Sequence, residues 1–118
     1  MIDYESMTNE ELNELAALRC GWTAEHQEEL QWIADHGELD YLTPYYTTSL
    51  DYCFAYFIPI LHQKIGNYVE VRLCFELSVC RCVIEGREGK WESTDPNPAR
   101  VFTIVFLKVE EQLANMKG

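Results

Sequence analysis

Residues 67–85 read NYVEVRLCFELSVCRCVIE, and this stretch decides the fold because apolar and polar residues alternate along it. Alternation with a period of two is typical of a β-strand that buries one face. The pattern forms two runs, 67–77 and 79–85, which a tight reversal at Leu77-Ser78 would join into a hairpin. One long bulged strand is the alternative interpretation, because Leu-Ser is a poor two-residue turn.

The segment after these strands predicts a long helix. Asp95 can cap it, and Pro96 can take the first helical position, where its missing N–H costs nothing. The run 101–109 that follows is almost wholly apolar, with β-branched residues that would also suit a strand. A length of about 20 residues favours a helix. A helix that is apolar on nearly all sides must be buried on more than one face, and a homodimer through this last helix would achieve that.

Two further helices are predicted upstream. Thr8-Asn9-Glu10-Glu11 matches a capping box, so a first helix is expected over about 9–20, and residues 1–7 are expected to form a loose arm. A middle helix is expected to begin near Ser49, to kink at Pro59 and to end at Gly66. Short strands are expected at 30–34 and at 90–93, the second after a turn at 86–89.

These elements predict a single α+β domain spanning residues 1–118, with the order α-β-α-β-β-(β)-α. The chain is long enough for one core. The apolar faces of the strands need helices against them, so we expect a layered α/β/α sandwich with a small, mainly antiparallel sheet.

The acidic charge is concentrated at one end of the sequence. Residues 1–40 hold 11 of the 20 acidic residues and a single base, Arg19, whereas residues 41–118 are nearly neutral. The nine Lys and Arg residues are not clustered, which argues against direct binding of nucleic acid or of an anionic membrane surface. A basic host protein is the partner that this charge favours.

The candidate partner-binding surface consists of acidic residues in this first third. They are Glu10, Glu11, Glu14, Glu25, Glu28, Glu29, Asp35, Glu38 and Asp40. Three tyrosines next to them are candidate interface aromatics, because tyrosine buries a large area while keeping a polar tip. They are Tyr41, Tyr45 and Tyr46. A solvated acidic face and tyrosines packed in the core are the structural alternatives.

Nothing in the sequence predicts a catalytic, metal or cofactor site. The five cysteines and three histidines are scattered without the spacing of a nucleophile–base pair or a metal site. The odd number of cysteines and a start without a signal-peptide pattern favour reduced thiols and a cytoplasmic location. We therefore expect a protein that is not an enzyme.

Several stretches resemble the phage ABA sandwich domain family. They are TNEELNELAALRCGW (8–22), YYTTSLD (45–51), NYVEVRLCFEL (67–77) and DPNPARVFTIVFLKV (95–109). The resemblance implies a small protein from a phage or prophage, with layered helices and strands and no established activity. It supplies no functional residues.

The charge pattern and the resemblance together suggest a non-catalytic, acidic protein-binding module. Its sharpest form is an inhibitor of a host nucleic-acid-binding or defence protein that imitates nucleic acid, as anti-CRISPR proteins do. The alternative is a homo-oligomeric structural or accessory phage protein.

Overall fold

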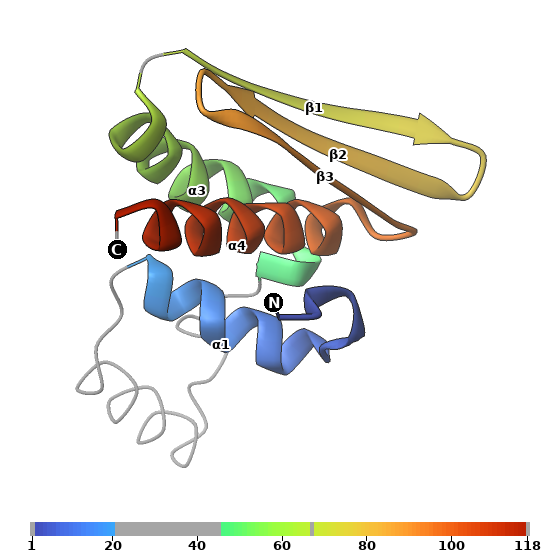
Figure 1. Cartoon of the computed structure of the whole chain (residues 1–118). Helices are drawn as coiled ribbons and strands as arrows, with labels where there is room; N and C mark the ends of the chain where they lie inside the picture. The colour runs from blue at the N-terminus through green and yellow to red at the C-terminus, as the bar shows by residue number, and fades with distance from the viewer. Residues whose placement is uncertain (1, 21–45, 67, 118) are drawn as a thin grey trace.

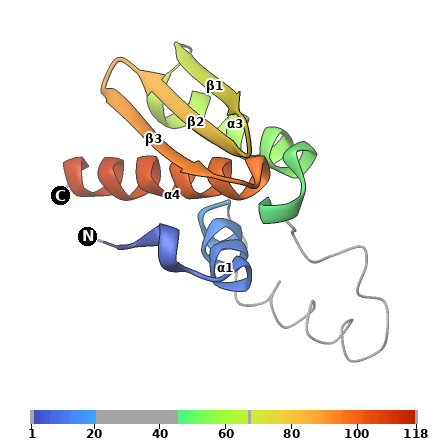
Figure 2. The ribbon, with the colours of Figure 1, turned by 90° about the vertical axis from the view of Figure 1, so that its right-hand side faces the viewer.

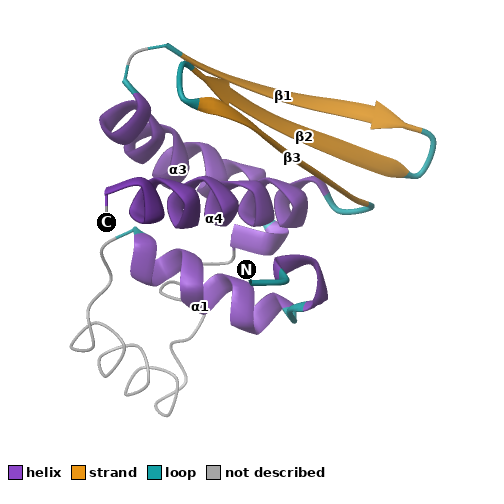
Figure 3. Ribbon diagram, in the orientation of Figure 1, coloured by secondary structure: helices purple, strands orange, loops and turns teal. Residues whose placement is uncertain are grey.

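The computed structural model describes residues 2–20, 46–66 and 68–117, which form a mixed α+β fold. The described helices are α1 (Asn9–Arg19), α3 (Leu50–Ile65) and α4 (Pro98–Lys117), with short 3-10 turns η1 (Tyr4–Ser6) and η3 (Tyr46–Thr48). The strands are β1 (Val69–Glu76), β2 (Val79–Gly86) and β3 (Gly89–Asp95). The α+β class is confirmed (Figures 1 and 3). The strand expected at 30–34 lies outside the described residues.

The described elements form three layers. The sheet is one outer layer, α3 and α4 lie beneath it, and α1 lies on the far side of α4 (Figures 1 and 2). Helices therefore cover the sheet as expected, but in the described residues they all cover the same face. The sheet is here an outer layer and not the middle one.

The alternating stretch forms two strands joined by a tight turn. The strands pair in antiparallel order β1-β2-β3, and Glu76 lies opposite Val79 on either side of Leu77-Ser78. The hairpin is confirmed, and a single bulged strand is not formed. Leu77 takes a left-handed φ of 53°, a conformation that glycine, asparagine or aspartate usually adopts. A leucine at this position therefore gives no turn signal in the sequence. Its side chain is fully exposed.

The second hairpin turns at Arg87-Glu88, where Gly86 lies opposite Gly89. A Cβ atom at Gly86 would lie 2.4 Å from Cγ2 of Ile65, so this glycine lets the end of α3 approach the sheet closely. β3 is longer than the expected strand at 90–93, because its pairing with β2 continues until Asp95 lies opposite Cys80.

The apolar character of α4 has a simple cause. This helix packs under β2 and β3 on one side and against α1 on the other, so every residue from Val101 to Leu107 is buried. Its apolar surface is covered within the chain. The homodimer through the last helix was expected because α4 would need a partner for its apolar surface. In the structure, residues 101–107 have no exposed apolar face to offer a second copy.

The start of α4 differs from the sequence expectation. The helix begins at Pro98 and not at Pro96. Oδ1 of Asn97 accepts hydrogen bonds from the backbone N–H groups of Ala99 (3.0 Å) and Arg100 (3.3 Å), which makes Asn97 the cap. Asp95 instead ends β3 and accepts a hydrogen bond from the N–H of Asn97 at 2.9 Å.

The other helix ends follow the sequence closely. Thr8 and Glu11 form the complete capping box of α1. Gly66, with a φ of 102°, follows the end of α3 at Ile65. α3 continues through Pro59, which lies on its exposed side, where a carbonyl that loses its helical partner can bond to water.

The N-terminal segment is packed, contrary to the expectation of a loose arm. Tyr4 is buried in the core, and residues 4–6 form the turn η1 beside α4. The physical reason is that Tyr4 provides an apolar anchor, and the side chain of Arg100 on α4 binds the backbone of Glu5 and Met7.

Candidate functional site

Three of the nine candidate acidic residues lie on α1. Glu10, Glu11 and Glu14 are all exposed, while Leu12 and Ala16 on the opposite side of the helix are fully buried. The helix is thus fixed against the core with its carboxylates directed to solvent. The other six lie outside the described residues: Glu25, Glu28, Glu29, Asp35, Glu38 and Asp40.

The three carboxylates of α1 have different roles. Oε1 of Glu11 accepts hydrogen bonds from the backbone N–H (3.3 Å) and the hydroxyl (3.1 Å) of Thr8, so this side chain holds the start of the helix. Glu10 and Glu14 are one helical turn apart, which is about 6 Å along the axis. Within residues 2–20, 46–66 and 68–117, neither takes part in an ion pair. Of the three carboxylates on α1, these two are available to a cation on a partner.

Tyr46 is a core residue and not a surface aromatic. Its side chain is 0% exposed, and its ring stacks on Phe57 with the centroids 5.0 Å apart. The edge of the ring meets Tyr56 at 5.9 Å. Tyr46 therefore belongs to the packing alternative, because η3 directs it between α3 and the rest of the core. Tyr41 and Tyr45 lie outside the described residues.

The buried thiols are poorly suited to nucleophilic catalysis. Burial raises the pKa of Cys53 and of Cys82 to about 12, and partial burial raises the pKa of Cys20 to about 11. The Sγ atom of Cys53 donates to the backbone oxygen of Tyr46 at 3.1 Å. These thiols stay protonated at neutral pH, whereas the thiolate is the nucleophile and the metal ligand. The described residues also contain no group of three or more potential metal ligands.

A partly buried ion pair joins α3 to α4 and was not predicted from the sequence. Nζ of Lys64 lies 2.5 Å from Oε2 of Glu110, whose side chain is 1% exposed. The other oxygen, Oε1, has no hydrogen-bond partner among the described residues. Glu110 directly follows the apolar run 101–109, and a charged residue continuing a buried helical face is the signal that could have revealed this pair.

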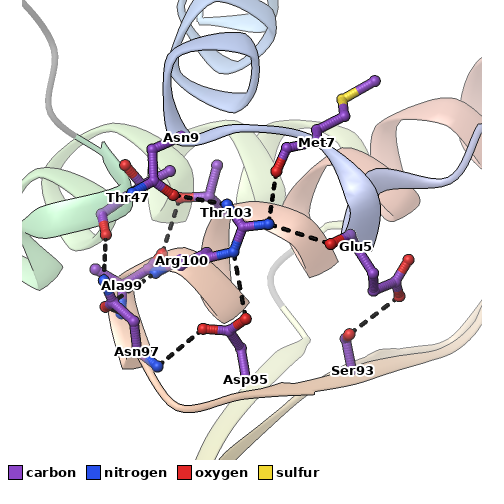
Figure 4. Close-up of polar contacts among 10 residues, drawn as sticks. All are labelled: Glu5, Met7, Asn9, Thr47, Ser93, Asp95, Asn97, Ala99, Arg100 and Thr103. Carbon is purple, nitrogen blue, oxygen red and sulfur yellow. Dashed lines mark hydrogen bonds and ion pairs between the residues drawn. The ribbon is translucent and has the colours of Figure 1, made fainter.

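Arg100 is the centre of a polar junction between both ends of the chain (Figure 4). Its Nε lies 3.3 Å from Oδ1 of Asp95, and its Nη1 donates to Oδ1 of Asn9 at 2.6 Å. Its Nη2 donates to the backbone oxygens of Glu5 and Met7. Nearly all the donors of the guanidinium are used within the chain, so this junction stabilises the fold and holds the start of α1 in place.

A shallow hollow of about 430 Å³ lies beside the N-terminal segment and α4. Three of its polar side chains are already engaged, because Trp91 Nε1 donates to Gln112 Oε1 at 2.5 Å and Lys108 pairs with Glu5 outside the hollow. Glu111 also lines the hollow, and within the described residues it takes part in no ion pair. In the described helices, none has both the length and the apolar character needed to cross a bilayer.

Comparison of the chain with protein-family models, with curated proteins and with solved structures gives no match. The resemblance to the phage ABA sandwich domain family stays a prediction.

Proposed function

We propose that the protein is a non-catalytic binding module that presents the outer face of α1 to a basic partner protein. The observation that supports this most directly is the arrangement of Glu10 and Glu14. Both carboxylates are exposed, one turn apart, on a helix whose opposite side is anchored in the core. A rigid support reduces the entropy lost on binding, so such charges can contribute to affinity.

The charge of the whole chain supports the same proposal. The first 40 residues have 11 acidic side chains against one basic side chain, so the negative potential is concentrated around the part of the sequence that contains α1. A concentrated field speeds association with a surface of opposite sign and weakens as salt is added.

In its sharpest form, the proposal is an inhibitor of a nucleic-acid-binding or defence protein in the cytoplasm of a bacterial host. Carboxylates displayed along a helix can occupy Lys and Arg side chains that would otherwise contact phosphates. A phage or prophage origin rests on the family resemblance alone. The protonated state of the buried thiols supports a role without nucleophilic catalysis.

A capture experiment tests this proposal. The full chain is immobilised and exposed to lysate of a candidate host at low and at high salt, and the bound proteins are identified. We expect basic proteins to bind at low salt, to elute as salt is raised, and to be displaced by a soluble DNA duplex or by single-stranded RNA.

Two double variants with the same change in charge make the test specific. Glu10→Gln with Glu14→Gln should reduce capture, because it removes the two free carboxylates of α1. Glu88→Gln with Glu92→Gln is the matched control, since both residues are exposed and lie at the β2–β3 turn and on β3, not on α1. Equal loss in both variants, or no basic protein captured at low salt, would contradict the proposal.

A further inference from the structure

The strand β1 forms an edge of the sheet and is incompletely covered (Figure 2). None of its residues is buried, whereas Cys80, Cys82 and Ile84 on the neighbouring strand are all at most 1% exposed. An edge strand leaves alternate backbone N–H and C=O groups without a partner in the sheet, so it is a template for another strand.

Exposed apolar side chains gather at the turn end of this strand. Phe75 is 67% exposed although its pairing with Cys80 places it on the helix-facing side, and Leu77 is fully exposed. Val79, directly after the turn, is 39% exposed. Solvent-exposed apolar residues next to an open strand edge favour burial against a partner.

The opposite edge of the sheet is protected. The hydroxyl of Ser93 on β3 donates to Glu5, and Nζ of Lys108 donates to the backbone oxygen of Glu92 at 3.4 Å. Natural edge strands are usually blunted by charged side chains, by proline, by bulges or by covering segments. β1 carries charges of both signs, Glu70, Arg72 and Glu76, which can repel or pair with those of another strand. β1 has neither proline nor glycine, and its pairing with β2 runs without a bulge from Val69 to Glu76. Among residues 2–20, 46–66 and 68–117, β1 is therefore the edge open to another strand.

Charge selects how a second copy would pair with β1. In a two-fold antiparallel pair, residues on the same face lie opposite each other, and the axes that pair at least five residues of β1 pass beside Val71, Arg72, Leu73 or Cys74. An axis at Val71 places Glu70 opposite Arg72 but leaves the exposed Phe75 and Leu77 outside the paired segment. An axis at Arg72 places the two arginines opposite each other, and an axis at Leu73 places Glu70 opposite Glu76 twice. Both arrangements put like charges directly across the strands, which is destabilising.

The axis at Cys74 gives opposite charges and matching apolar pairs. Arg72 then lies opposite Glu76 of the second copy, and Leu73 lies opposite the exposed Phe75, each twice by symmetry. Arg72 already contacts Glu70 at 2.9 Å and Glu85 at 3.4 Å, but its guanidinium has five N–H donors and can bind a further carboxylate.

We propose that β1 pairs with β1 of a second copy, antiparallel and centred on Cys74, so that two sheets become one continuous sheet. This surface goes beyond the proposed function and is independent of it, because none of its residues lies on α1. The predicted particle has twice the mass of the 13.8 kDa chain.

Sedimentation and light scattering on the reduced full chain, over a wide range of concentration, test the association. Arg72→Glu should favour the monomer, because it places a second carboxylate opposite Glu76 in both halves. Adding Glu76→Arg to it should restore the dimer by exchanging the two charges. Lys90→Glu makes the same change in charge on β3 and should leave the dimer intact. Circular dichroism checks that each variant is folded.

Oxidation by diamide tests the register. Paired Cα atoms in antiparallel strands are about 4.5 to 5.5 Å apart, within the span of about 4.4 to 6.8 Å that a disulfide accepts. The two Cys74 thiols would lose two protons and two electrons to diamide, which becomes the hydrazine, and form one intermolecular disulfide. Peptide mapping should find Cys74 linked to Cys74, and Cys74→Ser should prevent the link while the dimer remains.

Several results would overturn the proposal. A monomer at all concentrations, or a dimer that survives Arg72→Glu, would show that β1 is not the interface. A dimer that Arg72→Glu dissociates but that forms no Cys74 link would refute the register. None of these results bears on capture of a basic partner by α1, so the two proposals fail separately.

Discussion

Nη2 of Arg100 donates a 2.7 Å hydrogen bond to the backbone oxygen of Met7, 93 residues earlier in the chain. The side chain of Arg100 is only 15% exposed, and its partners include Asp95 and the backbone of Glu5. One guanidinium thus fixes the N-terminal segment and the start of α1 to α4.

Replacing this guanidinium should loosen the N-terminal segment. We expect Arg100→Met to lower the free energy of unfolding by about 1 to 3 kcal/mol, because partly buried carbonyl and carboxylate acceptors lose a charged donor. Urea denaturation measures the loss, and hydrogen exchange should show faster exchange over residues 2–8. Arg87→Met, in an exposed turn, is the control and should change little.

Removing Lys64 should lower the free energy of unfolding more than neutralising its partner Glu110. Lys64→Met leaves a carboxylate that is 1% exposed without its cation, and we expect a loss of up to about 3 kcal/mol. Removing one partner of a fully buried ion pair usually costs about 3 to 5 kcal/mol. The low end of that range applies here, because the Lys64 side chain is 37% exposed. Glu110→Gln keeps the shape without the charge and should cost less. Thermal or urea unfolding of both variants compares them, and a larger loss for Glu110→Gln would contradict this assignment.

The aromatic stack in the core should be sensitive to truncation. The rings of Phe57 and Phe106 lie with centroids 4.0 Å apart and planes 7° from parallel, and both residues are fully buried. Phe57→Ala should cost about 3 to 5 kcal/mol, because it leaves a cavity. Tyr68→Ala, at a ring that is 68% exposed, should cost far less in the same urea titration.

Alkaline pH should destabilise the fold through its buried thiols. Burial raises the pKa of Cys53 from 9.0 to about 12, so the folded chain keeps a proton that the unfolded chain releases above pH 9. The free energy of unfolding should therefore fall as pH rises from about 9 towards 12, by up to about 1.4 kcal/mol per pH unit for each such thiol. Cys53→Val should reduce that slope. An unchanged slope would show that Cys53 does not contribute to it.

Leu77 should be replaceable with a gain in stability. Its φ of 53° lies in the left-handed region, which costs a non-glycine residue about 1 to 2 kcal/mol. Leu77→Gly should recover part of this cost, because the exposed side chain contributes no core packing. Thermal unfolding at low concentration, where chains are separate, measures the gain, and Ser78→Gly is the control at the neighbouring position.

Local patterns predicted the elements well where short-range chemistry decides them. The capping box at Thr8 and Glu11 is complete within four residues, and strand alternation follows directly from burial of one face. The sequence DPNP, by contrast, offers two caps in a row, Asp95 before Pro96 and Asn97 before Pro98. Contacts with distant parts of the chain decide which residue caps α4. Asp95 is held in β3 opposite Cys80, while the Asn97 amide also donates to the backbone oxygen of Thr47 at 2.8 Å.

The candidate site was predicted only in part for a similar reason. Exposure of Glu10 and Glu14 follows from helical periodicity, since Leu12 and Ala16 mark the buried side. Nothing local distinguishes Tyr46 from the tyrosines near it, and its burial depends on Phe57, which is eleven residues away. The β1 edge was also hidden, because alternation predicts a strand but not whether it has one neighbour or two.

The position of α4 between the sheet and α1 also constrains the order of assembly. The segment around Glu5 and Met7 binds Arg100 and Lys108, which are among the most distant residues along the chain. Contacts that close such long loops form late, because the chain between the two residues must lose conformational entropy before the contact can stabilise the fold. We expect the sheet hairpins and α4 to associate first and the N-terminal segment to dock last, so this segment is also the first that should open in the native protein.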